Sequence, residues 1–307
     1  MAPEIDLKTY IEELRKNMNL KVRDEIIEKD LLLTLILAEF EKNNLGENLI
    51  FKGGTLLSRN YLKYHRFSED LDFVYKDSWQ LRELTRNKRE RKIKEFIELF
   101  APKLKKVADS LGLEFDIDRS NKKFCTIIHG RAVYTFRIYY SKNQYIKVEI
   151  NFVEKLINPP IETSIKAITD FFDSRELMLI LGLSINNFNV LSYSLQEIIL
   201  EKYRAVLTRK KLQERDLFDL FLIKGSLEAD IKKIVEKIRN SSLIKRELNN
   251  LIKEKLNLLE EGKFFNSDEK IEELAVFGHN KEGFEKFKEK IKPILVKICR
   301  EFLSTLF

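Results

Sequence analysis

Hydrophobic residues recur at helical spacing along the first part of the chain. Leu31, Leu35 and Ala38 lie three and four residues apart, which is the spacing of one face of an α-helix. The pattern therefore predicts helices over residues 6–43. A turn-forming cluster of Asn, Leu and Gly at residues 43–46 then ends the helical pattern.

The spacing then changes back and forth between that of strands and that of helices. β-Branched and aromatic residues dominate the strand candidates, whereas the helix candidates keep a period near 3.6. In chain order the pattern predicts a buried strand at 49–51, a helix over 55–64, a strand over 71–75, a helix over 80–111 interrupted near Pro102, and strands over 132–140 and 144–153. The last two flank Ser141-Lys142-Asn143, which predicts a β-hairpin.

The chain changes character at Pro159-Pro160. Before these prolines, residues 113–153 have a period of two, and after them every predicted element is a helix. The helices are expected over residues 162–171, 173–183, 194–208, 214–224 and 228–307. We therefore expect an α+β fold of two domains, with N-terminal helices and a mixed sheet in residues 1–158 and an all-helical domain in residues 161–307.

Composition indicates a globular chain that is large enough for two domains. Its 307 residues are 44% hydrophobic and 34% charged, and single cores stop growing near ~250–300 residues. The longest uncharged apolar run, residues 31–38, is far shorter than the ~20 residues of a membrane span, and the first residues lack a signal-peptide pattern. Cys125 and Cys299 are far apart in the sequence, which is typical of a reducing compartment. We expect a cytoplasmic protein without membrane contact.

The net charge of +7 favours a polyanionic partner through counterion release. Lys and Glu alternate along the predicted helices, however, and this pattern is more typical of solvated surfaces. The densest basic stretches are residues 82–94 and 204–211. Contact with RNA or a nucleotide is therefore expected in one of these two stretches.

Two acidic residues stand at the entrance of the strand predicted over 71–75. Asp70 and Asp72 are two positions apart, so their carboxylates share one face of the strand, about 6.6 Å apart along it. Carboxylate oxygens are preferred ligands of Mg²⁺, and paired ions ~4 Å apart serve phosphoryl chemistry. Glu149 is the candidate for a third ligand, because an acid among strand-forming apolar residues requires a partner or a metal. Asp-x-Asp alone is more often solvated surface, so the metal hypothesis depends on the neighbouring motifs.

Gly53 and Gly54 separate the strand predicted at 49–51 from a predicted helix. Without Cβ atoms the backbone can approach a triphosphate, and N–H groups at the helix start can hold its oxygens. Thr55 is expected to cap this helix or to reach a phosphate. Two glycines alone usually form only a turn, and the segment lacks the Gly-Lys-Ser/Thr ending of a P-loop. The combination of strand, glycines, helix and acidic strand nevertheless favours a nucleotide site.

A second cluster is expected in the helical half. Lys202 and Arg209 share a face of one predicted helix, and Asp216 and Asp219 share a face of the next. Two interpretations stay open. The cations and acids either pair to join the two helices, or Lys202 binds a triphosphate while Asp216 orients it or acts as a base.

Five segments occur in a recognisable order: Glu28-Lys29-Asp30, Phe51-Lys52-Gly53-Gly54-Thr55, Arg66-Phe67-Ser68-Glu69-Asp70-Leu71-Asp72, Glu201-Lys202-Tyr203-Arg204-Ala205 and Arg215-Asp216-Leu217-Phe218-Asp219-Leu220. Together they resemble the AbiEii-type nucleotidyltransferases, which are toxins of type IV toxin–antitoxin and abortive-infection systems with a DNA polymerase β-like core. The resemblance covers roughly residues 25–225.

The resemblance implies a Mg²⁺-dependent enzyme, with Mn²⁺ as an alternative ion, that moves an NMP from an NTP to an acceptor hydroxyl. The 3′ end of tRNA is the acceptor in relatives, and a cognate antitoxin protein would be a partner. Asp70 and Asp72 would be the catalytic metal ligands, with Glu149 as a third ligand by superfamily analogy. Lys202 and Asp216 would also be catalytic. The implied nucleotide-binding residues are Lys52, Gly53, Gly54, Thr55, Ser68 and Lys202.

Two other functions compete with nucleotidyl transfer. A metal-dependent nuclease would also gather acids around Mg²⁺, but such nucleases commonly place a carboxylate two residues before a lysine, whereas this chain has Lys147-Val148-Glu149. A catalytically idle protein that keeps the fold to bind nucleotide or RNA would not require Asp70, Asp72 and Lys202 together. The sequence leaves open the preferred NTP, the acceptor and the oligomeric state.

Overall fold

The computed structural model describes residues 7–18, 20, 22–128, 132–171, 188–241, 245–266 and 280–304. The chain divides into two compact units. The sheet unit comprises Met1–Glu154 and Pro160–Tyr193, and the helical unit comprises Lys155–Pro159 and Ser194–Phe307. Among the described residues, no helix is both long enough and apolar enough to cross a membrane.

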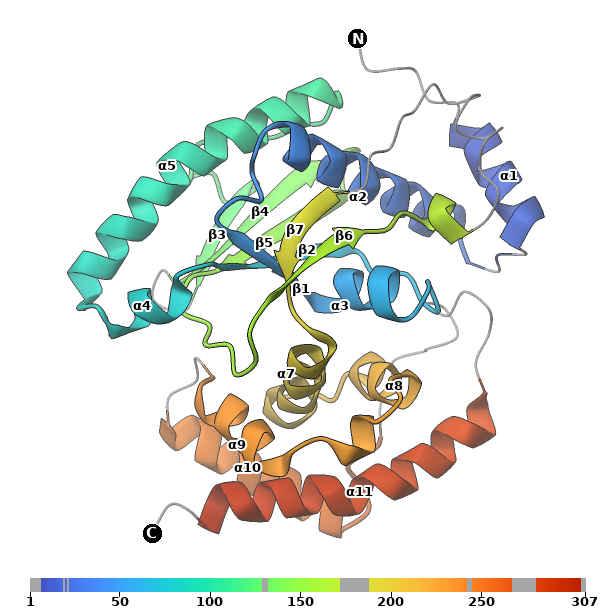
Figure 1. The fold of residues 1–307 in the computed structure, drawn as a ribbon, viewed down its shortest axis with the longest axis vertical. Helices are drawn as coiled ribbons and strands as arrows, with labels where there is room; N and C mark the ends of the chain where they lie inside the picture. Colours follow the sequence, from blue (N-terminus) through green and yellow to red (C-terminus); the bar gives the residue numbers. More distant parts are fainter. Residues whose placement is uncertain are drawn as a thin grey trace. The chain divides into compact units, whose positions relative to one another are not determined.

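In the described part of the sheet unit, seven strands form one mixed sheet (Figure 1). The strands are β1 (Leu49–Lys52), β2 (Asp70–Tyr75), β3 (Cys125–Ile128), β4 (Val133–Tyr139), β5 (Tyr145–Asn151), β6 (Ile161–Ile165) and β7 (Phe188–Ser192). Their order across the sheet is β3-β4-β5-β2-β1-β7-β6. β2 is parallel to β5 and β1 is parallel to β7, whereas the other neighbours are antiparallel. This mixed sheet with its helices confirms the predicted α+β class.

Helices α2 (Asp24–Lys42) and α5 (Arg86–Ser110) lie over one face of the sheet (Figure 1). The described part of the unit also has α1 (Leu7–Met18), α3 (Gly53–Leu56) continued by a π-helical turn (Leu57–Tyr61), α4 (Ser78–Glu83) and a 3₁₀ turn (Ile168–Phe171). The ring of Phe40 in α2 packs on Phe73 of β2 and on Phe100 of α5, with centroids 5.8 and 6.3 Å apart. Burying one such side chain contributes roughly 1.5–3 kcal/mol. Because side chains alternate along β2, Asp70 and Asp72 lie on the face opposite Phe73.

Helix α5 runs without interruption through Pro102, so the break predicted there is wrong. A proline removes one backbone hydrogen bond from a helix interior. The loss is offset by the apolar stripe of α5, in which Ile97, Phe100 and Leu104 on both sides of the proline are buried. Tertiary packing therefore outweighs the local preference of proline.

The prediction that only helices follow Pro160 is wrong for two segments. Ile161–Ile165 forms β6 and Phe188–Ser192 forms β7. β7 pairs with β1, which lies far away in the sequence, and β6 pairs with β7 along its whole length. Residues 161–193, which the sequence pattern assigned to the helical domain, thus belong to the sheet unit. The helix predicted over residues 173–183 lies outside the described residues.

Every regular element in the described part of the helical unit is helical. These elements are α7 (Leu195–Thr208), α8 (Glu214–Leu222), a 3₁₀ turn (Ser226–Glu228), α9 (Ile231–Arg239), α10 (Lys245–Glu260) and α11 (Lys281–Ser304). Lys237 of α9 forms a fully buried ion pair with Glu197 of α7 at 2.8 Å. Glu197 also accepts hydrogen bonds from the backbone N–H groups of Ile157 and Asn158. This carboxylate therefore fixes the segment Lys155–Pro159 within the helical unit.

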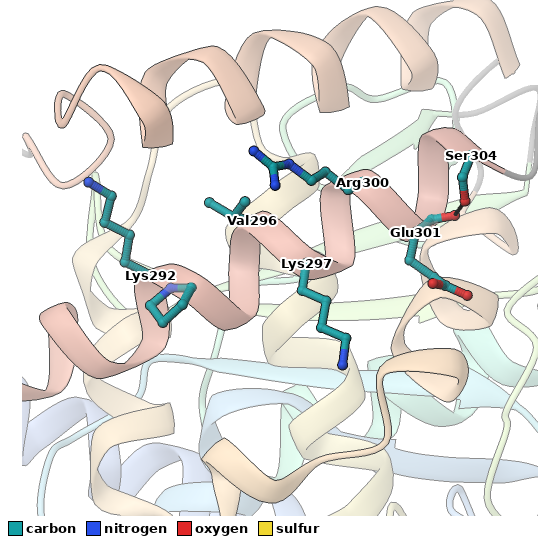
Figure 2. A pocket seen from close by; sticks show the side chains of 7 residues that line it. Lys292, Val296, Lys297, Arg300, Glu301 and Ser304 are labelled. Carbon is teal, nitrogen blue, oxygen red and sulfur yellow. Dashed lines mark hydrogen bonds between the residues drawn. The ribbon is translucent and has the colours of Figure 1, made fainter.

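An open hollow of about 600 Å³ runs along α11 (Figure 2). Its lining includes Lys292, Val296, Lys297 and Arg300. Figure 2 shows Val296 and Arg300 on one side of the helix and Lys297 on the other, and Arg300 is ion-paired with Glu260 at 2.9 Å. None of the residues predicted for the functional site lines this hollow. The hollow is therefore no part of the predicted functional site.

Candidate active site

Strands β2 and β5 bring four charged side chains onto one face of the sheet. Their parallel register places Asp70 opposite Lys147 and Asp72 opposite Glu149. Alternation along each strand directs all four side chains to the same face, while the apolar residues between them are buried on the other. The three acids predicted as metal ligands thus lie on neighbouring strands, with a lysine in their midst.

Asp70, Asp72, Lys147 and Glu149 form a charged strip on this face, and their charges shift one another's pKa values. Lys147 Nζ lies 3.1 Å from Asp70 Oδ2 and 3.8 Å from Glu149 Oε2. Burial lowers the pKa of Lys147, but attraction to the three carboxylates outweighs it and the net shift is upward. Burial is the largest cause that raises the pKa of Asp72 to about 6, with Lys147 opposing the rise and Glu149 adding to it. The strip is therefore a concentrated acidic site that keeps one ammonium charged at neutral pH.

The two glycines that begin α3, here called the glycine turn, lie close to three polar side chains, one in β2 and two just before it. Gly53 has a φ of +85°, which glycine adopts without strain. A Cβ at Gly53 would lie 2.5 Å from Asp72 Oδ2. A Cβ at Gly54 would lie 2.8 Å from the Ser68 hydroxyl and 2.8 Å from an Arg66 guanidinium nitrogen. Because only glycine leaves room at these positions, the loop backbone lies directly against Asp72 and Ser68.

The two residues that flank the glycines have different tasks. Lys52 ends β1 and is the antiparallel partner of Asp72, whose charged form its ammonium favours. Thr55 is buried, and its hydroxyl donates a hydrogen bond to the carbonyl oxygen of Asp70. No side chain caps the start of α3. The capping role predicted for Thr55 is therefore wrong, and its side chain instead fixes the entrance of β2.

The helical unit holds the second predicted cluster. Lys202 Nζ of α7 lies 2.9 Å from Asp216 Oδ1 and 2.6 Å from Asp219 Oδ2 of α8. Arg209 Nε approaches the other Asp216 oxygen at 3.3 Å. Both aspartates are buried, so these cations supply the compensation that a buried carboxylate requires. The predicted pairing of the two helices is present, and a role of Lys202 toward a triphosphate stays a prediction.

The predicted site residues fall into two groups, one in each unit. A family model described as the nucleotidyl transferase AbiEii toxin of type IV toxin–antitoxin systems matches residues 35–297, which include both groups. The chain belongs to the AbiEii nucleotidyltransferase toxin family. The match extends beyond residue 225, where the motif resemblance ended, so α9, α10 and most of α11 are part of the AbiEii region. No curated protein matches the chain.

Membership of the AbiEii family implies a nucleotide substrate and a cognate antitoxin. The divalent ion expected for such chemistry matches the donor set of the strip, since carboxylate oxygens are the ligands that Mg²⁺ and Mn²⁺ prefer. Within the described residues, no three His, Cys, Asp or Glu side chains are gathered as a metal requires. At the predicted position, Asp70 and Glu149 both face the ammonium of Lys147. These acids fit a hard cation by their chemistry, and metal binding by Asp70, Asp72 and Glu149 stays a prediction.

Lys147, like Asp219 and Arg209, is missing from the site residues predicted by sequence. For Lys147 and Asp219 the sequence holds a spacing signal. Lys147 is two residues before Glu149 and so shares its strand face, and Asp219 is one helical turn after Asp216. The Lys147 signal identifies no partner, because charged residues at such positions usually face solvent, whereas pairing of Asp219 with the cations of the preceding helix was one of the two interpretations of the sequence. Only the register of β2 and β5 reveals that Lys147 meets Asp70.

Replacing Gly53 with Ala is expected to lower nucleotidyl transfer about 10²-fold, which is the cost of a ~1 Å misplacement of reacting groups. The new Cβ would displace the Asp72 carboxylate. Gly112→Ala is the matched control, since Gly112 has a φ of +67° and no atom within 4 Å of its would-be Cβ. Both changes strain the backbone by about 1–2 kcal/mol, but only the first touches the site. Equal initial rates of transfer in the two variants would contradict the proposed importance of the contact.

Proposed function

We propose that this protein uses a divalent metal ion to transfer an NMP from an NTP to an acceptor hydroxyl, with the 3′ end of tRNA as the acceptor. The observation that carries the proposal is the contact between Gly53 and the Asp72 carboxylate. A turn suited to phosphate oxygens and a carboxylate suited to a metal ion meet at this point, as a nucleotide–metal complex requires. The acidic pair at the start of β2 in a mixed sheet also supports a polymerase β-like core.

The glycine turn has the task of holding the triphosphate. Gly53 and Gly54 let the backbone approach the phosphates closely, and N–H groups at the start of α3 donate hydrogen bonds to them. Ser68, whose hydroxyl lies beside Gly54, offers a further donor. Lys52, at the end of β1, adds positive charge near the same point.

Asp70, Asp72 and Glu149 have the task of holding the ion. When bound, it would neutralise charge on the triphosphate and lower the pKa of the acceptor hydroxyl. In the transfer, the acceptor oxygen bonds to the α-phosphorus and pyrophosphate leaves with the electrons of the broken P–O bond. The proton of the acceptor hydroxyl is released to water.

The proposed mechanism includes Lys202 and Asp216 because their motifs match those of AbiEii-type enzymes. We assign Lys202 to the triphosphate and Asp216 to orienting the lysine. Asp216 and Asp219 together hold the Lys202 ammonium, which restricts its position without removing its charge. A charge held in place in this way is suited to a phosphate whose own charge changes during transfer.

The acceptor RNA has only modest electrostatic support. In the basic stretch at residues 82–94, Arg86, Arg91 and Lys94 each pair with a glutamate one helical turn further along α5. In the other stretch, Arg209 is engaged with Asp216, while Lys210 and Lys211 are exposed. RNA contact therefore depends on the exposed lysines and on the net charge of +7.

Transfer to RNA is tested by incubating the protein with each α-³²P-labelled NTP, total tRNA and Mg²⁺ or Mn²⁺. We expect label on RNA and one pyrophosphate released per labelled acceptor. Asp70→Ala should abolish both signals. Asp118→Ala is the matched control, because Asp118 is an exposed aspartate of the same unit that only caps a turn at Ser120.

The other outcomes separate the competing functions. Shortened RNA without label would indicate a nuclease. Pyrophosphate release without labelled RNA would indicate transfer to another acceptor, such as a protein or a small molecule. Neither RNA change nor pyrophosphate release would indicate a protein that binds nucleotide or RNA without catalysis.

A further inference from the structure

Lys147 lies beside two of the predicted metal ligands, one on its own strand and one on the neighbouring strand. Its Nζ lies 3.1 Å from Asp70 of β2 and 3.8 Å from Glu149 of β5. Asp72 is the register partner of Glu149 and attracts the same ammonium. The lysine is thus a cation among three carboxylates, and it has no part in the proposed transfer of the NMP.

One ammonium is poorly matched to this environment. It sets one positive charge against three carboxylates, of which only Asp72 is also attracted by Lys52 among the causes of its pKa shift, and the two carboxylates that it approaches are at different distances. An ordinary exposed salt bridge between a lysine and one acid forms without further carboxylates nearby, and it contributes little to stability. A divalent ion in the same place would carry twice the charge and could bind several carboxylate oxygens at once. The environment is therefore better suited to a divalent cation than to the ammonium that it holds.

We propose that the Lys147 ammonium is a built-in substitute for the divalent ion, which holds the carboxylates in the metal-free protein and is displaced when the ion binds. This inference rests on the proposed function, because it requires that these carboxylates bind a metal. Two cations this close repel each other, so the ion and the ammonium compete for one position. Lys147 is in this sense a positioning residue, which keeps the acids together without the ion and weakens the affinity for it.

Mn²⁺ binding to the full-length protein tests the competition without any catalytic assay. Free Mn²⁺ is measured by electron paramagnetic resonance during titration of wild type and Lys147→Met, in the absence of nucleotide. We expect Lys147→Met to bind Mn²⁺ about tenfold more tightly or better, because one repelling charge beside the ion is removed. Lys123→Met is the matched control, since Lys123 pairs with Glu114 at 2.6 Å elsewhere in the sheet unit, and its affinity should equal that of wild type.

Thermal melting gives a second readout, in which the metal-free Lys147→Met variant is expected to be less stable although it binds Mn²⁺ more tightly. In EDTA, Lys147→Met should melt at a lower temperature than wild type and Lys123→Met, because its carboxylates repel one another. Saturating Mn²⁺ should raise the melting temperature of Lys147→Met more than that of wild type. Lys147→Gln replaces the Met variant if circular dichroism shows that the latter is unfolded.

The outcomes distinguish the inference from the proposed function. Equal Mn²⁺ affinity of Lys147→Met and wild type, with binding lost in Asp70→Asn, would overturn the substitute role and leave the metal site intact. Mn²⁺ binding by none of the proteins would overturn both. Mn²⁺ binding by Lys147→Met alone would support the inference, since it would show that the ammonium excludes the ion.

Discussion

Asp72→Asn is expected to lower nucleotidyl transfer by about 10³-fold, the effect of losing one dominant electrostatic group in an active site. The amide has the same shape as the carboxylate, so the close contact with Gly53 is retained. It has no negative charge to hold a metal ion beside the glycine turn. The measurement is the initial rate of label transfer from NTP under the conditions that give the highest wild-type rate, with folding checked by circular dichroism. A near-normal rate in the folded variant would exclude Asp72 as a metal ligand.

The same substitution has a pH-dependent effect on stability, whose direction follows from the raised pKa. In the metal-free protein, burial foremost raises the pKa of Asp72 from 3.8 to about 6. Ionisation of Asp72 therefore costs the folded state more than the unfolded state, so the stability that Asp72 contributes is full below pH ~4 and is lost as pH rises through 6. In EDTA, Asp72→Asn should gain melting temperature relative to wild type between about pH 5 and 8.

Asp118→Asn is the control for this pH effect. Hydrogen bonds from the Ser120 backbone and hydroxyl lower the pKa of Asp118, so its titration lies below the pH range of the comparison. Its difference from wild type should therefore stay constant between about pH 5 and 8. A parallel gain in both variants would show that the effect does not arise from Asp72.

The pattern of apolar and polar residues is sufficient to predict those elements whose buried positions are determined by residues close by in the sequence. The strand at 49–51 is present because its continuous apolar run is buried at every position. The strand over 71–75 and the hairpin around residues 141–143 are present because alternation of apolar residues favours burial of one face. The face shared by Asp70 and Asp72 follows from the same alternation. Glu149 was placed near them by analogy, and the β2–β5 register puts it beside Asp72.

The elements that pattern missed depend on distant partners. Ile161–Ile165 carries two apolar residues only at its ends, and a strand of this composition is stabilised by pairing with β7 rather than by its own sequence. Lys147 illustrates the same limit for the site. Its spacing relative to Glu149 is visible in the sequence, but its meeting with Asp70 arises from the pairing of strands 75 residues apart along the chain. No periodicity within a single strand identifies which strand will be its neighbour.

Arg59→Ala is expected to lower the free energy of unfolding by about 3–5 kcal/mol, because it leaves a buried carboxylate without its partner. Arg59 Nη2 lies 2.7 Å from Asp30 Oδ1 and 3.1 Å from the Asp30 carbonyl oxygen. Both side chains are almost fully buried, at 2% and 4% exposure. Denaturant unfolding measures the change. Arg86→Ala, which removes an exposed arginine paired with Glu90 in the same unit, should leave the stability almost unchanged.

The Asp30–Arg59 pair also connects the segment Glu28-Lys29-Asp30 to the glycine turn. Arg59 lies in the π-helical turn that continues α3, the short helix that begins at Gly53, and Asp30 lies in α2. The pair therefore anchors the helix whose first residues touch Asp72. We expect Asp30→Ala/Arg59→Ala to be less destabilised than the sum of the single changes, since it leaves no unpaired charge. Strict additivity would show that the pair is not coupled. Folded Arg59→Ala should also transfer NMP more slowly than Arg86→Ala, because the glycine turn loses its fixed position against Asp72.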